Sequence, residues 1–89
     1  MKKLNLNFAI TDLDGVELAK ANKLMAASLM GEKQGDAVKY FDWAMTLNKE
    51  GIIEVDESDF NKIKEIVDKT EAITLIVKAQ ILKYFSTLK

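Results

Sequence analysis

Apolar and polar residues alternate along positions 4–10, where asparagine occupies positions 5 and 7. An alternation with period two is typical of a strand that has one buried face. Residues 11–15 read Thr-Asp-Leu-Asp-Gly, and Asp and Gly at this spacing favour a tight turn. Residues 16–18 are expected to return as a short second strand. The pattern therefore predicts an N-terminal β-hairpin whose buried face carries Leu4, Leu6, Phe8 and Ile10.

Two helices are predicted after the hairpin. Residues 19–30 are rich in Ala, Leu and Met, which are strong helix formers. A polar break separates them from a second helix over 37–48, with Asp36 as its N-cap and Gly51 just beyond its end. The apolar positions of this second helix are Ala37, Tyr40, Phe41, Ala44, Met45 and Leu47, with Trp43 on a neighbouring face.

The second half of the chain predicts a short extended segment and two more helices. Residues 52–55 are apolar and β-branched, which favours a third strand or an extended link. Asp56 or Ser58 can cap the next helix, whose buried stripe contains Phe60, Ile63, Ile66 and Val67. The last helix is predicted over 70–88 and carries apolar residues on more than one stripe. We expect it to be central to the core or to share a face with another chain.

These elements describe one small α+β domain over residues 1–89, in which the hairpin and the short third strand pack on about four helices. A hydrophobic fraction of 48% and a charged fraction of 30% are ordinary for a folded globular protein. The N-terminus lacks the continuous apolar run of a signal peptide, and no stretch approaches the ~20 apolar residues of a membrane span. A cytoplasmic location, in a bacterial or host cell, is the resulting expectation.

Several chemistries are excluded by composition. The chain has no Cys and no His, which rules out thiolate nucleophiles, His-dependent triads and His/Cys zinc sites. All 13 basic residues are Lys, and the net charge is −1. Nucleic-acid binding usually requires a basic patch, and Lys2 and Lys3 form only a pair. We expect no cofactor and no metal, and we rank nucleic-acid association below protein association.

Residues 8–16 resemble the first motif of the haloacid-dehalogenase phosphatase family, in which an apolar strand ends in Asp-x-Asp-Gly. The resemblance implies that Asp12 is a nucleophile and Asp14 a general acid/base in an Mg²⁺-dependent phosphatase. That family also has a doubly wound sheet, whose later strands carry a Lys and an acidic motif. This chain has no later apolar strand that is long enough for such a sheet. A turn built from Asp and Gly is therefore the favoured interpretation, and phosphatase-like activity ranks third.

The spacing of the same carboxylates does not match the calcium-binding loop of an EF-hand. An EF-hand loop needs Gly at its sixth position and Glu at its twelfth, and counting from Asp12 places Glu17 and Lys23 there. The later acidic cluster is explained by helix capping and a solvated helix face. Its members are Glu54, Asp56, Glu57 and Asp59.

The aromatic residues at positions 40, 41 and 43 are the candidate partner-binding residues. They cannot all face inward on one narrow helical stripe. At helical spacing, Phe41 fits the core best, together with Phe60, Ile63, Ile76 and Phe85. Tyr40 and Trp43 are then the predicted partner-binding residues, because exposed aromatics are enriched among side chains that dominate interface energies.

As a whole, the chain resembles small bacteriophage- and prophage-encoded proteins without a catalytic signature. The similarity runs through 11–15, 35–40, Trp43, 55–59 and 78–82. The resemblance implies a bacterial setting and a phage accessory or assembly role, and it assigns no catalytic residue. The leading hypothesis is a non-enzymatic protein–protein interaction module that binds another protein or itself. A nucleic-acid-associated accessory protein is the alternative.

Overall fold

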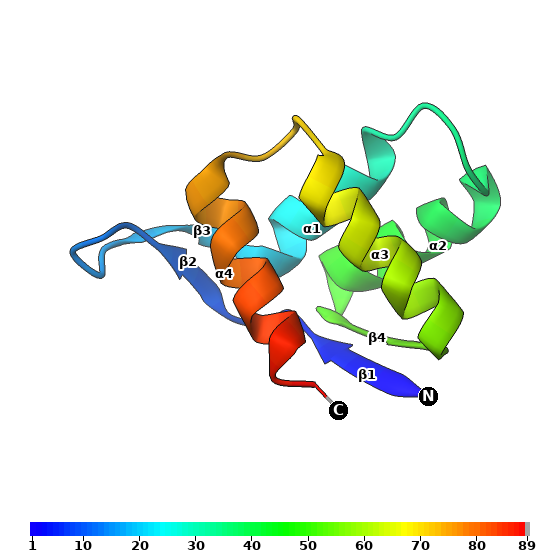
Figure 1. Cartoon of the computed structure of the whole chain (residues 1–89), viewed down its shortest axis with the longest axis horizontal. Helices are drawn as coiled ribbons and strands as arrows, with labels where there is room; N and C mark the ends of the chain where they lie inside the picture. Colours follow the sequence, from blue (N-terminus) through cyan, green and yellow to red (C-terminus); the bar gives the residue numbers. More distant parts are fainter. Residues whose placement is uncertain (89) are drawn as a thin grey trace.

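The computed structural model describes residues 1–88 and has a mixed α+β architecture (Figure 1). Its strands form two small antiparallel sheets, one from β1 with β4 and one from β2 with β3. The bounds are β1 (Lys2–Asn5), β2 (Ala9–Thr11), β3 (Glu17–Lys20) and β4 (Ile52–Val55). The α+β prediction is thereby confirmed, and residues 52–55 form a strand.

Four helices make up most of the described residues, as predicted. Their bounds are α1 (Ala21–Met30), α2 (Ala37–Lys49), α3 (Glu57–Lys69) and α4 (Leu75–Ser86). Helices α1 and α2 pack closely against each other, and α3 packs against both α1 and α4. The β2–β3 pair extends away from the helices at the left of Figure 1, where α4 crosses its base. No helix within residues 1–88 has the length and apolar character needed to cross a membrane.

The N-terminal region departs from the predicted hairpin. The alternation predicts a single strand over residues 4–10 that pairs with 16–18, but β1 and β2 are separate strands with different partners. Leu4 in β1 lies opposite Ile53 in β4, whereas Ile10 in β2 lies opposite Ala19 in β3. Asn7 explains the division, since its Nδ2 donates to the Glu50 carbonyl at 3.0 Å. This contact anchors the bend between β1 and β2 to the end of α2.

The predicted turn between β2 and β3 is confirmed. Asp12 Oδ1 accepts hydrogen bonds from the backbone N–H groups of Asp14 and Val16, each at 2.9 Å. Gly15 has a φ of 85°, a left-handed value that glycine adopts without steric cost. The local sequence therefore specifies this turn, including the role of its first aspartate.

Helix boundaries follow the predicted caps at three places. Asp36 accepts from Lys39 N at 3.0 Å, and Asp56 accepts from Asp59 N at 2.7 Å. Gly51 has a φ of 78° just after α2. The predicted start of the last helix is wrong, because Thr70 is the C-cap of α3 and its Oγ1 accepts from Ala72 N at 3.1 Å. This turn delays α4 until Leu75.

The core lies between the helices and the inner faces of the strands. Phe60 of α3 and Phe85 of α4 meet edge to face there, with ring centroids 5.4 Å apart. Phe60, Ile63 and Phe85 are buried as predicted, and Ile76 is partly buried. Helix α4 buries one stripe within the chain, formed by Val77, Ile81 and Phe85.

Polar side chains of α4 fasten it to the N-terminal strands. Tyr84 Oη accepts from Asn5 N at 2.8 Å. The Gln80 amide makes two bonds to one residue of β2: it accepts from Thr11 N at 3.1 Å and donates to Thr11 O at 2.6 Å. Gln80 thereby occupies the backbone groups through which Thr11 would otherwise pair with another strand.

Candidate functional site

The two predicted partner-binding residues lie together, but one of them faces inward. Tyr40 is 5% exposed, and Trp43 is partly buried. Their rings stack with centroids 5.7 Å apart and planes inclined by 17°. Gly35 lies against the Tyr40 ring, at a φ of 115°, where a Cβ atom would come within 2.7 Å of the ring. Tyr40 is thus held between the α1–α2 loop and Trp43.

The predicted core position of Phe41 is wrong, because its side chain is 52% exposed. Tyr40, Ala44 and Leu47 occupy the inner stripe of α2. A second stripe at spacing i, i+3, i+7 faces outward and consists of Val38, Phe41 and Met45, which are 72%, 52% and 55% exposed. Helix α2 therefore carries two apolar stripes, and only one of them is covered by the chain itself.

Two adjoining hollows flank the outward stripe. The larger has a volume of ≈ 510 Å³ and lies between the end of α1, the following loop and the start of α2. The smaller has a volume of ≈ 330 Å³ and lies over the middle of the α1–α2 pair. Met30 and Phe41 line both hollows. We define the α1–α2 face as the exposed residues Ala27, Met30, Val38, Phe41 and Met45.

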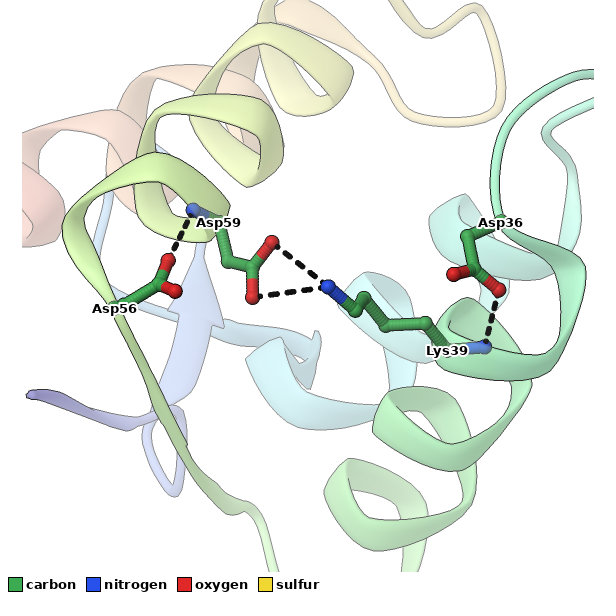
Figure 2. Close-up of polar contacts among 4 residues, drawn as sticks. All are labelled: Asp36, Lys39, Asp56 and Asp59. Atoms are coloured by element: carbon green, nitrogen blue, oxygen red, sulfur yellow. Dashed lines mark hydrogen bonds and ion pairs between the residues drawn. The ribbon is translucent and has the colours of Figure 1, made fainter.

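An ion pair links the N-terminal end of α2 to α3. Figure 2 shows Lys39 reaching from α2 to Asp59 of α3, with Nζ–Oδ distances of 3.2 and 3.3 Å. The hydrogen bond to Asp59, followed by the charge of Asp59, raises the pKa of Lys39 above its ordinary value. The same Nζ lies 5.7 Å from the centroid of the Trp43 ring. This contact places the Lys39 ammonium over the Trp43 ring.

The helix N-termini beside this ion pair are already capped from within the chain. Asp36 and Asp56 accept from the backbone of their own helices, as Figure 2 shows. Among residues 1–88, no group of three or more acidic side chains has an arrangement that could hold a metal ion. These groups stabilise the fold around the α1–α2 face.

Charged residues border both ends of the α1–α2 face. Glu32, Lys33 and Asp36 lie at the N-terminal end of α2. At the other end, Lys23 Nζ donates to the Asn48 carbonyl at 2.8 Å and to Asn48 Oδ1 at 3.0 Å. Lys49 closes the last turn of α2. The face is therefore apolar in its middle and charged at its ends.

The carboxylates of the phosphatase-like motif are placed differently from that family's motif. Asp12 follows β2, which belongs to a two-stranded antiparallel sheet and not to a doubly wound parallel one. One carboxylate oxygen of Asp12 accepts two backbone hydrogen bonds in the turn. The Asp12 carboxylate thus has a structural role in this turn.

Comparison with known proteins found no matching family model, curated protein or solved structure. Function is therefore inferred from the surface of the chain itself. The sequence did not lead us to predict that Val38, Phe41 and Met45 form an exposed stripe on α2. Their spacing was a usable signal, because positions 38, 41 and 45 form a stripe distinct from positions 40, 44 and 47.

Proposed function

We propose that the chain is a non-enzymatic protein–protein interaction module and that the α1–α2 face is its contact surface. One observation carries this proposal: Met30, Val38, Phe41 and Met45 are all about half exposed or more and border two adjoining hollows. Contiguous exposed apolar surface of this kind marks interaction sites in soluble proteins.

The residue types on this face suit association with a protein. Phe41 presents a large aromatic ring that can act as an anchor. Met30 and Met45 have flexible, polarisable side chains that adapt to a partner's shape. Tyr40 and Trp43 support the face from beneath, since their stacked rings position the first turns of α2. This support replaces the direct contact that the sequence suggested for Tyr40.

Nucleic-acid association has less support. Stacking of bases on aromatic residues normally accompanies a positive groove along the nucleic-acid backbone. Near the α1–α2 face, Lys39 is paired with Asp59, and Lys23 is bound to Asn48. The bacteriophage resemblance adds a setting to the leading proposal: an accessory or assembly role in the cytoplasm of a bacterial cell.

A photoreactive phenylalanine analogue at position 41 tests the proposal in cells that express the chain. We expect one discrete protein adduct from position 41 and none from position 13, because Leu13 is 96% exposed but lies at the tip of the β2–β3 pair. Adding Met45→Glu should abolish the adduct, since a charge within the contact is costly to desolvate. Absence of any adduct, or equal labelling from both positions, would overturn the proposal.

A further inference from the structure

We propose that the α1–α2 face binds the same face of a second copy of this chain, with the two α2 helices antiparallel about a twofold axis beside Phe41. This inference rests on the proposed function and names the partner. It follows from the layout of the outward stripe along α2 and from the distribution of charge at the two ends of the face.

The outward stripe is symmetric about its centre. Val38 and Met45 lie two helical turns apart, or about 10 Å along the axis at ~1.5 Å per residue. Phe41 lies near the midpoint between them. A twofold axis beside Phe41 therefore brings the two Phe41 rings together and places each Val38 opposite the other chain's Met45. The short Val38 leaves room for the long Met45, so the pairing is complementary in size as well as in polarity.

The hollows beside Phe41 give the partner's side chains space. Both are bordered by Met30 and Phe41, so a ring inserted between the two chains has a hollow on either side. Ala27 adds little bulk to the α1 side of the face, which allows the second α2 to approach. Helices that pack in this way have interaxial distances of about 8–10 Å.

Charge at the ends of the face favours the antiparallel orientation. Besides Lys39, which is paired with Asp59 of α3, the N-terminal end of the face has two acids and one base, and the C-terminal end has two bases and one acid. Antiparallel pairing places each net acidic end against a net basic end of the other chain, whereas parallel pairing places like against like. The groups are Glu32, Asp36 and Lys33 at one end, and Lys23, Lys49 and Glu50 at the other.

Asp42 is the unfavourable group in this arrangement. It is exposed and follows Phe41, so the twofold axis brings the two Asp42 carboxylates close together at the same edge of the helix pair. Their repulsion weakens the pairing of the wild-type chain. The arrangement therefore predicts that Asp42→Asn strengthens self-association. The substitution adds no apolar surface, and its effect would come from removing the repulsion between the two carboxylates.

Cysteine cross-linking tests the orientation, because the chain has no native Cys. Val38→Cys and Met45→Cys variants are mixed and oxidised, and all other residues of the face stay intact. We expect the mixed disulfide, which joins position 38 of one chain to position 45 of the other, to form about tenfold faster than either symmetric product, because association raises the local thiol concentration. Leu13→Cys and Leu75→Cys are the controls, since their positions are 96% and 81% exposed and lie outside the face.

Sedimentation of the wild-type chain supplies the second measurement. A monomer–dimer equilibrium that shifts toward dimer in Asp42→Asn and toward monomer in Phe41→Asp supports the inference. Predominantly symmetric disulfides, or cross-linking at the control rate with a monomer at all concentrations, would overturn it. If the chain is monomeric while position 41 photo-labels a different protein, the second-copy inference fails and the proposed function stands. If position 41 labels nothing, both fail.

Discussion

Replacing Gly51 by alanine tests the joint at which α2, β4 and the bend between β1 and β2 meet. Gly51 is buried and has a φ of 78°. A Cβ atom at position 51 would overlap the side-chain amide of Asn7. The distance from this Cβ to Asn7 Nδ2 would be only 2.6 Å. Asn7 would then have to move and give up its hydrogen bond to the Glu50 carbonyl, which is 3.0 Å long.

The expected loss of stability is about 2 kcal/mol, from two costs and one partial offset. A left-handed alanine costs about 1–2 kcal/mol, and the lost hydrogen bond about 0.5–1.5 kcal/mol. Reduced entropy of the unfolded chain offsets about 0.4–1 kcal/mol of this cost. For a chain of this size, the melting temperature should fall by roughly 8–16 °C, measured by circular dichroism or calorimetry.

A double-mutant cycle with Asn7→Ala separates the two causes. Asn7→Ala alone should cost about 1 kcal/mol, as expected for one hydrogen bond. In that background, Gly51→Ala no longer meets the amide, so its cost should fall to the backbone contribution of about 1 kcal/mol. A Gly51→Ala variant that melts at or above the wild-type temperature would refute the reasoning. Strict additivity would show that the Asn7 contact is irrelevant.

Three further predictions concern the faces of α2, the attachment of α4 and pH. Tyr40→Ala should lower the free energy of unfolding by about 3 kcal/mol or more, because Tyr40 is buried. Phe41→Ala should change the free energy of unfolding of the monomer by less than about 1 kcal/mol. Equal effects of the two substitutions in urea titrations would contradict the assigned faces. Gln80→Glu should be less stable than Gln80→Ala, because a carboxylate cannot donate to the Thr11 carbonyl; faster hydrogen exchange at the Thr11 amide in both variants would report the lost contact. The hydrogen bond from Lys69, four residues on, lowers the pKa of Glu65 below its ordinary value of 4.5. A lowered folded-state pKa gives stability that is fully present above the ordinary value and is lost as pH falls through the folded-state value. Glu65→Gln should remove this part of the acid dependence of melting, and an unchanged pH profile would contradict it.

Local signals in the sequence were sufficient to predict most of the helices. Asp36 and Asp56 precede helical stretches and accept from the backbone three residues on, which is the interaction that makes Asp a strong N-cap. The turn after β2 was predictable for the same reason. The start of α4 was missed because Thr70 can either begin a helix or close one, and the choice depends on how α3 ends.

The division of the N-terminal segment depends on contacts distant in sequence. Of the residues that the alternation over 4–10 places on the buried face, Leu4, Leu6 and Ile10 are buried and Phe8 is partly buried. The alternation is equally compatible with one strand or with two. The bend is set by Asn7 binding Glu50 and by β1 pairing with β4. Neither partner can be identified from the alternation itself.

The orientation of α2 was ambiguous for a related reason. Tyr40 and Phe41 are adjacent, and each begins or continues an apolar stripe of similar strength. Which stripe is buried depends on the space left by α1 and by Gly35, whose close approach to Tyr40 admits no side chain. Residue spacing thus predicts two candidate faces, and tertiary packing selects the inner one.

The different partners of β1 and β2 give the two sheets different requirements during folding. The β2–β3 pair closes a turn of about five residues, whereas β1 and β4 meet only after a loop of roughly fifty residues is closed, which costs about 2 kcal/mol more in chain entropy. The β2–β3 pair can therefore form early and locally. Formation of α1 and α2 shortens the chain between β1 and β4, so we expect the β1–β4 sheet to form later than the β2–β3 pair.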